Sequence, residues 1–169
     1  MSVVAAERHR LDVDRSLVGF VVGDVAYAVP IGSVREILRP SEVTALAHAP
    51  SDIVGVVDHR GEVVPIVSMR RRLGLPEPTD ASRSKWILVQ VAGRILGLVV
   101  DGVTDVFGSG DGALRPPPAV ETGRSARGFA GVVNHGGRLV FVLDLEALRP
   151  LLVELPQSRP AAENNEAGS

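Results

Sequence analysis

"GVVDHRGEVVPIV" (residues 55–67) and "GVVNHGGRLVFVL" (residues 131–143) are two versions of one stretch of sequence. Six of the thirteen aligned positions are identical, and most of the others exchange one aliphatic side chain for another. Each version has two runs of β-favouring residues around a short turn that contains glycine, which is the pattern of a hairpin. The chain therefore contains two related β units, and the differences between them, above all Arg60 against Gly136, point to function.

The similarity extends to the segments that precede these two stretches. Each is preceded by another predicted hairpin, which joins "LVGFVV" (17–22) to "VAYAV" (25–29) in the first unit and "WILVQV" (86–91) to "RILGLVV" (94–100) in the second. After these hairpins, "IGSVREIL" (31–38) aligns with "VDGVTDVF" (100–107) at an offset of 103 − 34 = 69, whereas the opening pair aligns at 131 − 55 = 76. Each unit thus reads as a hairpin, a short apolar turn or helix, a loop and a second hairpin.

A unit of about five strands leaves exposed edges unless its sheet closes on itself. We therefore predict a mainly β fold in which two five-stranded β-barrel subdomains, each closed or nearly closed, pack together, with short helices. The folded part is predicted to be residues 16–153. Residues 1–15 and 154–169 have no helical or strand period and little to bury, so they are predicted to be flexible tails.

Composition limits the classes of function. The chain has 169 residues, 45% of them hydrophobic and 22% charged, as in a soluble globular protein. Its formal charge of −2 gives no general attraction for nucleic acid. It has no cysteine, and therefore no disulfide or thiolate metal site. Its apolar runs are too short to insert into a membrane and its start lacks the apolar core of a signal peptide, so we predict a cytoplasmic protein.

The turn of the repeated hairpin isolates one residue. Asp58 at the first position and Gly61 at the fourth match a type I turn, whose two central residues point to solvent. Nothing in the folding of the hairpin requires Arg60, since the second copy makes the same turn with Gly136. Arg60 is either a solvated turn charge or a hydrogen-bonding fork for the carboxylate or backbone carbonyl of a partner.

Other chemistry has weak support in the sequence. His59 and His135 are predicted to be surface residues at equivalent turn tips, because two imidazoles alone do not make a zinc site. "GSGDG" (108–112) lacks the lysine and the following helix of a phosphate-binding loop. The basic run Arg70 to Arg72 is predicted to be a solvated strand end, since nucleic-acid binding would also need aromatic platforms. We expect no enzymatic activity, no cofactor and no metal.

Four segments, taken in order, resemble the CheW family of chemotaxis coupling proteins. They are "SLVGFVVGDVAYAVPIGSVREIL", "APSDIVGVVDHRGEVVPIVSMRRRLGL", "ILGLVVDGVTDVF" and "LRPPP". The resemblance covers about residues 17–150. It implies two SH3-like five-stranded β-barrels and a non-catalytic adaptor, which links the cytoplasmic tips of chemoreceptors to the regulatory domain of the histidine kinase CheA.

The resemblance also implies a set of partner-binding residues. Arg60 matches the arginine of the family's "RG" turn, Glu36 matches an acidic residue near it, and Gly55 belongs to the same set. Val34 and Val103 match positions near partner contacts, although barrel core is an equal interpretation. If "SVREIL" forms a helical turn, Glu36 lies outside it, and we hypothesise that it pairs with Arg60 until a partner competes.

The sequence departs from the family's pattern beside this turn. "DHRG" stands where the family usually has "NLRG", and Ser68 replaces an acidic residue next to the basic run. These differences predict a more positive face. They leave open a specialised member that binds receptors without kinase, and, as a different class, a small-barrel nucleic-acid-binding protein.

Overall fold

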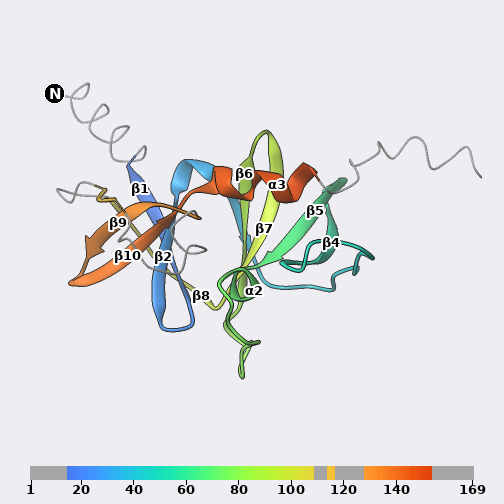
Figure 1. Ribbon diagram of the computed structural model, residues 1–169, viewed down its shortest axis with the longest axis horizontal. Helices are drawn as coiled ribbons and strands as arrows, with labels where there is room; N and C mark the ends of the chain where they lie inside the picture. Colours follow the sequence, from blue (N-terminus) through green and yellow to red (C-terminus); the bar gives the residue numbers. More distant parts are fainter. Residues whose placement is uncertain (1–14, 109–113, 117–127, 154–169) are drawn as a thin grey trace, which may run out of the picture.

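The computed structural model of the protein describes residues 15–108, 114–116 and 128–153. The fold is mainly β, with few and short helices (Figure 1). The strands are β1 Ser16–Val22, β2 Val25–Pro30, β3 Val34–Leu38, β4 Ile53–His59, β5 Glu62–Ser68, β6 Lys85–Val91, β7 Arg94–Val100, β8 Gly102–Gly108, β9 Phe129–His135 and β10 Arg138–Leu143. The helical turns are η1 Ile31–Ser33, α2 Met69–Arg72, η3 Leu145–Leu148 and α3 Arg149–Val153. The predicted tails, apart from Arg15, and residues 109–112 of the loop considered above lie outside the described residues.

All four predicted hairpins are confirmed. β1 pairs with β2, β4 with β5, β6 with β7, and β9 with β10, each antiparallel. Each turn has two residues between the strands, as shown by the pairs Val22↔Val25 and His59↔Glu62. The β-branched runs and their glycine-containing turns therefore determine the local structure as the sequence indicates.

The two sequence repeats exchange their first hairpins. One sheet has the order β8-β1-β2-β10-β9 and the other β3-β6-β7-β5-β4, so each contains the first hairpin of one repeat and three strands of the other. Parallel pairing of β2 with β10 and of β5 with β7 joins the two parts. In Figure 1 the blue β1 and β2 consequently lie beside the orange β9 and β10. The prediction that each repeat folds as a separate unit is wrong.

The hydrogen-bonded ladders of the two sheets are open. Among the described residues, no ladder joins the edge strand β3 to β4 or the edge strand β8 to β9, so the predicted closed barrels are not formed by strand pairing. An isolated bridge nevertheless brings each sheet close to a closed barrel. Thr44, beyond the end of β3, pairs with Val56 of β4, and Arg115, beyond the end of β8, pairs with Val132 of β9. Each sheet therefore curls until the chain leaving one edge strand reaches the other edge strand.

The predicted helical turn at "SVREIL" is wrong. Only Ile31–Ser33 forms a 3-10 turn, and Val34–Leu38 is strand β3, paired with β6. Burial alternates along β3, which leaves the side chain of Ile37 41% exposed and brings Glu36 to the half-buried side. The spacing of Val34, Ile37 and Leu38 also fits one face of a helix. The segment is extended instead because its backbone pairs with β6 at the edge of a sheet.

The core has three parts. A large cluster with residues from both sheets, among them Phe20, Ile87 and Leu98, holds the sheets together. Two smaller clusters are each confined to one sheet; Val140 belongs to one and Val64 to the other. Successive side chains of a strand point to opposite faces, and the central strands contribute one face to the large cluster and the other face to a smaller one. This explains why their sequences are continuous apolar runs.

Candidate partner-binding site

Glu36 and Arg60 form the ion pair that the sequence suggested. Nη2 of Arg60 donates to Oε1 of Glu36 at 3.3 Å, and the side chain of Arg60 is 77% exposed. Glu36 projects from β3 and Arg60 from the turn between β4 and β5. An exposed pair of this kind contributes only about 0.2–1 kcal/mol, so it orients the guanidinium more than it stabilises the fold.

His59 completes a group of three side chains. Its Nε2 lies 3.0 Å from Oε2 of Glu36, so the carboxylate contacts both the imidazole and the guanidinium. The interpretation of His59 as a surface turn residue is wrong, because it is the last residue of β4 and is half-buried. The cluster of Glu36, His59 and Arg60 is called the cationic tip below, after the exposed guanidinium of Arg60.

The sheet that contains β8 and β9 has an equivalent pair, which the sequence did not lead us to expect. Nε2 of His135 lies 2.8 Å from Oδ2 of Asp105, and the imidazole stacks on the ring of Phe107 with 3.8 Å between centroids. The hydrogen bond to His135 is the main cause that holds the pKa of Asp105 below its usual value. The repeat offsets relate this pair to Glu36 and His59, since 36 + 69 = 105 and 59 + 76 = 135.

These two carboxylate–histidine pairs occupy matching places. Glu36 and His59 connect β3 with β4, and Asp105 and His135 connect β8 with β9. In both sheets these are the edge strands that no ladder joins. Each pair therefore bridges the gap in its sheet by side chains where backbone pairing is absent.

The backbone of Arg60 distinguishes the cationic tip from its counterpart. Arg60 and Gly61 have φ angles of 54° and 83°, so they are the two central residues of a type I′ turn, and the predicted type I turn is wrong. The matching residues Gly136 and Gly137 have φ angles of 61° and 77°. A left-handed backbone costs a residue with a side chain roughly 1–2 kcal/mol, which glycine avoids. Arg60 thus occupies a position where the second repeat has the residue that suits the turn.

Gly55 is explained by close packing. It is buried, and a Cβ added to it would lie 2.3 Å from the carbonyl oxygen of Thr44. Gly131 is in the same situation beneath the carbonyl oxygen of Arg115, at 2.5 Å. Both glycines allow the crossing segment to form its isolated bridge to the neighbouring residue. A part for Gly55 in partner binding stays a prediction, and it would be indirect.

Val34 and Val103 are half-buried and pack against the large core cluster. Val34 begins β3 and Val103 is near the beginning of β8, at matching places in the two sheets. Their packing explains why both are valine. Whether their remaining exposed surface contacts a partner stays a prediction.

The basic run beside Ser68 does not form a free positive face. Arg70, Arg71 and Arg72 each pair with a carboxylate, from Asp101, Glu77 and Asp52 respectively. Asp101 accepts from Nε and Nη2 of Arg70 at 2.9 and 2.7 Å, and Gly23 N donates to it at 2.7 Å. The Arg70 hydrogen bonds are the first cause that lowers the pKa of Asp101. The predicted positive face is therefore neutralised.

Ser68 has a local structural role. It is buried, and its hydroxyl accepts from the backbone N–H of Arg71, which caps α2. Asp144 caps η3 in the same way at the matching place in the second repeat. Serine and aspartate are both good N-cap residues, so the loss of the acid keeps the cap.

The part of the chain that the structure describes contains neither a candidate metal-ligand group nor a membrane-spanning helix. There, no three His, Asp or Glu side chains are grouped so that they could hold a metal ion. No helix within these residues is long and apolar enough to cross a membrane. What these residues present is a pair of curled sheets whose turns are exposed.

Comparison with known proteins identifies the family. The CheW-like domain family matches residues 16–150. The probable chemotaxis protein CheW of Rhizobium etli is 34% identical over 135 residues, which cover 80% of this chain and 87% of that protein. The chemotaxis protein CheW of Rhizobium meliloti is 34% identical over 145 residues, covering 86% and 94%. The chain belongs to the CheW-like domain family, and it is a chemotaxis adaptor.

A solved structure agrees with the fold. The scaffolding protein TtCheW from Thermoanaerobacter tengcongensis superposes with a TM-score of 0.70 at 24% sequence identity. The superposition covers 78% of this chain and 89% of that protein. The arrangement of two curled five-stranded sheets is therefore shared with a known scaffolding protein.

Proposed function

We propose that this chain is a non-catalytic, cytoplasmic adaptor that couples the cytoplasmic tips of chemoreceptors to the regulatory domain of a CheA-type histidine kinase. Membership of the CheW-like domain family supports the chemotaxis role. The rigid attachment of the two sheets through one shared core supports a geometric mechanism. Two partners that bind one rigid body bias each other's conformations when each prefers the same arrangement.

The observation that carries the assignment of the binding site is the left-handed backbone of Arg60. Because its counterpart in the second repeat is glycine, the turn itself does not require the side chain of Arg60, which leaves the guanidinium for a partner. The guanidinium offers parallel N–H donors to a carboxylate or to backbone carbonyls of a partner. Glu36 and His59 hold it in place until the partner competes for the pair.

We further propose that the two sheets act as SH3-like barrels. The isolated bridges at one end of each opening and the carboxylate–histidine pairs support this description. Rigid barrels would keep Arg60, Glu36, Val34, Gly55 and Val103 in fixed relative positions while a partner binds.

The alternatives have less support. A nucleic-acid-binding role is disfavoured, because the arginines of the basic run are paired with carboxylates. A receptor-binding protein without kinase binding is suggested by "DHRG" and by the loss of an acid at Ser68, and the second of these is explained by an equivalent N-cap. Sedimentation of this protein with a receptor-tip fragment, with the kinase regulatory domain, and with both separates these cases. We expect a complex that contains all three proteins.

A further inference from the structure

The interiors of the two curled sheets are built from matching positions but are filled differently. In the sheet that contains β6 and β7, Leu88 is 1% exposed and packs in the cluster within that sheet, with Ile95 beside it. The matching residues of the other sheet are Gly19 and Ala26, since 88 − 69 = 19 and 95 − 69 = 26. Two large aliphatic side chains of one interior are therefore replaced by a hydrogen atom and a methyl group in the other.

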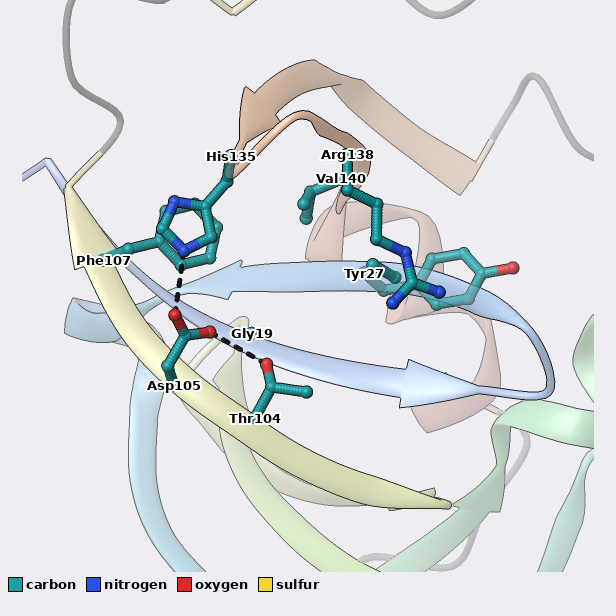
Figure 2. A pocket seen from close by; sticks show the side chains of 9 residues that line it. Gly19, Tyr27, Thr104, Asp105, Phe107, His135, Arg138 and Val140 are labelled. Carbon is teal, nitrogen blue, oxygen red and sulfur yellow. Dashed lines mark hydrogen bonds and ion pairs between the residues drawn. The ribbon is translucent and has the colours of Figure 1, made fainter.

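An open cavity lies beside Ala26, whereas the space next to Gly19 is already filled, since a Cβ added there would lie 2.7 Å from Thr104, 3.1 Å from Asp105 and 3.2 Å from Phe107. The cavity has a volume of about 140 Å³ and is lined by Gly19 and Ala26 of the first hairpin, Val140 of β10, and the stacked rings of Phe107 and His135. Figure 2 shows Phe107 and His135 together on one side and Arg138 on the other. Tyr27, Thr104 and Asp105 complete the lining, so the walls combine apolar side chains with one carboxylate, and Arg138 lies at the rim.

The size of the cavity indicates its occupant. Engineered apolar cavities of roughly 150 Å³ accept a benzene ring, whereas sites for drug-sized ligands and cofactors occupy about 300–1,000 Å³. The cavity is therefore large enough for one aliphatic or small aromatic side chain and too small for a cofactor. Ala26 shows which kind of group fits, because the matching position of the other sheet holds Ile95.

Arg138 indicates the charge of the occupant. It is exposed, its Nη2 donates to the backbone oxygen of Asp24 at 2.7 Å, and it forms no ion pair with a carboxylate among the residues that the structure describes. The acid beside it in the cavity, Asp105, is already engaged by His135 and Thr104. The matching residue of the other repeat is Glu62, so this rim has the opposite charge. The free donors of Arg138 suit an incoming carboxylate.

We propose that this cavity is a docking site for an extended segment of a protein partner, which inserts a leucine-like side chain between β8 and β10 while a neighbouring acidic side chain pairs with Arg138. The edge strand β8 lies beside the opening and shares no ladder with β9, and exposed sheet edges commonly receive extended peptides. The site belongs to the sheet opposite the cationic tip. It does not depend on the coupling role or on Arg60.

The test is a titration of ¹⁵N-labelled full-length protein with short capped peptides, followed by amide chemical shifts. The probe is Ac-Ala-Leu-Glu-Ala-NH2. The controls are Ac-Ala-Ala-Glu-Ala-NH2, which lacks the side chain that fills the cavity, and Ac-Ala-Leu-Lys-Ala-NH2, which reverses the charge. We expect saturable shifts at Gly19, Ala26 and Val140 with the first peptide at millimolar concentrations, and at least tenfold weaker binding of both controls.

Variants test the same site from the protein side. Ala26→Ile places the matching residue of the other repeat in the cavity, and Arg138→Glu does the same at the rim. Both should abolish the shifts, whereas Arg39→Glu, an equal change of charge at an exposed residue after β3, should leave them intact. Thermal melting checks folding, and Ala26→Val, a smaller addition at the same position, replaces Ala26→Ile if the latter unfolds.

The outcomes distinguish the parts of the proposal. Absence of shifts at the cavity with the leucine–glutamate peptide overturns it. Equal binding of the lysine peptide, or full binding to Arg138→Glu, overturns the role of Arg138. Shifts centred on the β3 and β4 sheet would place peptide binding elsewhere and would also overturn it.

Discussion

The Nε2 atom of His135 lies 2.8 Å from Oδ2 of Asp105 and joins the two edge strands of its sheet, at the place where Glu36 and His59 join those of the other. The two repeats therefore preserve a polar contact between strands that share no ladder. What they do not preserve is the residue that follows the histidine, which is Arg60 in one repeat and Gly136 in the other. The shared contact has a structural role in both repeats, whereas Arg60 is present in only one of them and is available for binding.

His135 is expected to stabilise its sheet by stacking as well as by its hydrogen bond. Replacing it with alanine removes both contacts, and we expect a loss of about 1–2 kcal/mol, since an aromatic pair contributes about 0.5–1.5 kcal/mol and a hydrogen bond about 1 kcal/mol. His135→Phe keeps a ring against Phe107 and should recover part of the loss. Urea denaturation of the three proteins measures these differences. Equal stability of the wild type and His135→Ala would contradict the bridging role.

Asp101 is expected to make stability depend on acid pH. Its folded pKa is lowered by Arg70, so its contribution is fully present above the unfolded value of about 3.8 and is lost as the pH falls through the lower folded value. Asp101→Asn should destabilise the protein by about 1.5–3 kcal/mol at neutral pH, because it weakens charged hydrogen bonds to Arg70. The difference between wild type and variant should shrink below pH 4. Thermal unfolding at several pH values checks this, and a difference that stays constant into strong acid would refute it.

Gly55 is expected to tolerate no side chain. Gly55→Ala directs a methyl group at the carbonyl of Thr44, and overpacking of this kind costs about 1–3 kcal/mol. The matched control is Gly32→Ala, because nothing lies within 4 Å of its added Cβ and its φ angle is not in the left-handed region. Denaturation midpoints of the two variants should differ clearly. Similar midpoints would show that the crossing segment yields without cost.

Arg60 is expected to contribute nothing to stability. Arg60→Gly removes a strained left-handed residue and also a weak ion pair, so the two effects nearly cancel or favour the variant. Charge reversal by Arg60→Glu should also leave the melting temperature nearly unchanged. A large drop in melting temperature for either variant would mean that Arg60 is structural.

Much of the fold follows from sequence, because it depends on local patterns. The β-branched runs around Gly23, Gly61, Gly93 and Gly137 predict four hairpins, and all four form. The exchange of hairpins could not be predicted in this way. The parallel pairing of Val140 with Ala26 joins residues that are distant in the chain, and a repeat records similarity without recording which strands pair.

The site was predicted in part. The pair of Glu36 and Arg60 was expected and is present, whereas His59 was assigned to the turn instead of the strand, so its contact with Glu36 was missed. The predicted type I turn has His59 and Arg60 at its centre, whereas the observed turn has Arg60 and Gly61 there. His59 is therefore the last residue of β4, and its side chain contacts the Glu36 carboxylate. The repeat offsets relate Asp105 to Glu36 and His135 to His59, so this equivalent pair can be predicted only once the contact between Glu36 and His59 is known.

The most direct measurement is a calorimetric titration of this protein with the regulatory domain of the CheA-type kinase from the same organism. It compares the wild type with Arg60→Gly, which copies the turn of the second repeat and keeps the fold, and with Ala26→Ile, which leaves the cationic tip untouched. We predict micromolar binding by the wild type and clearly weaker binding by Arg60→Gly, with an unchanged melting temperature. The affinity of folded Ala26→Ile then tests whether the kinase uses the cavity. Absence of binding by the wild type would contradict the coupling role, and unchanged affinity of Arg60→Gly would remove Arg60 from the interface with the kinase.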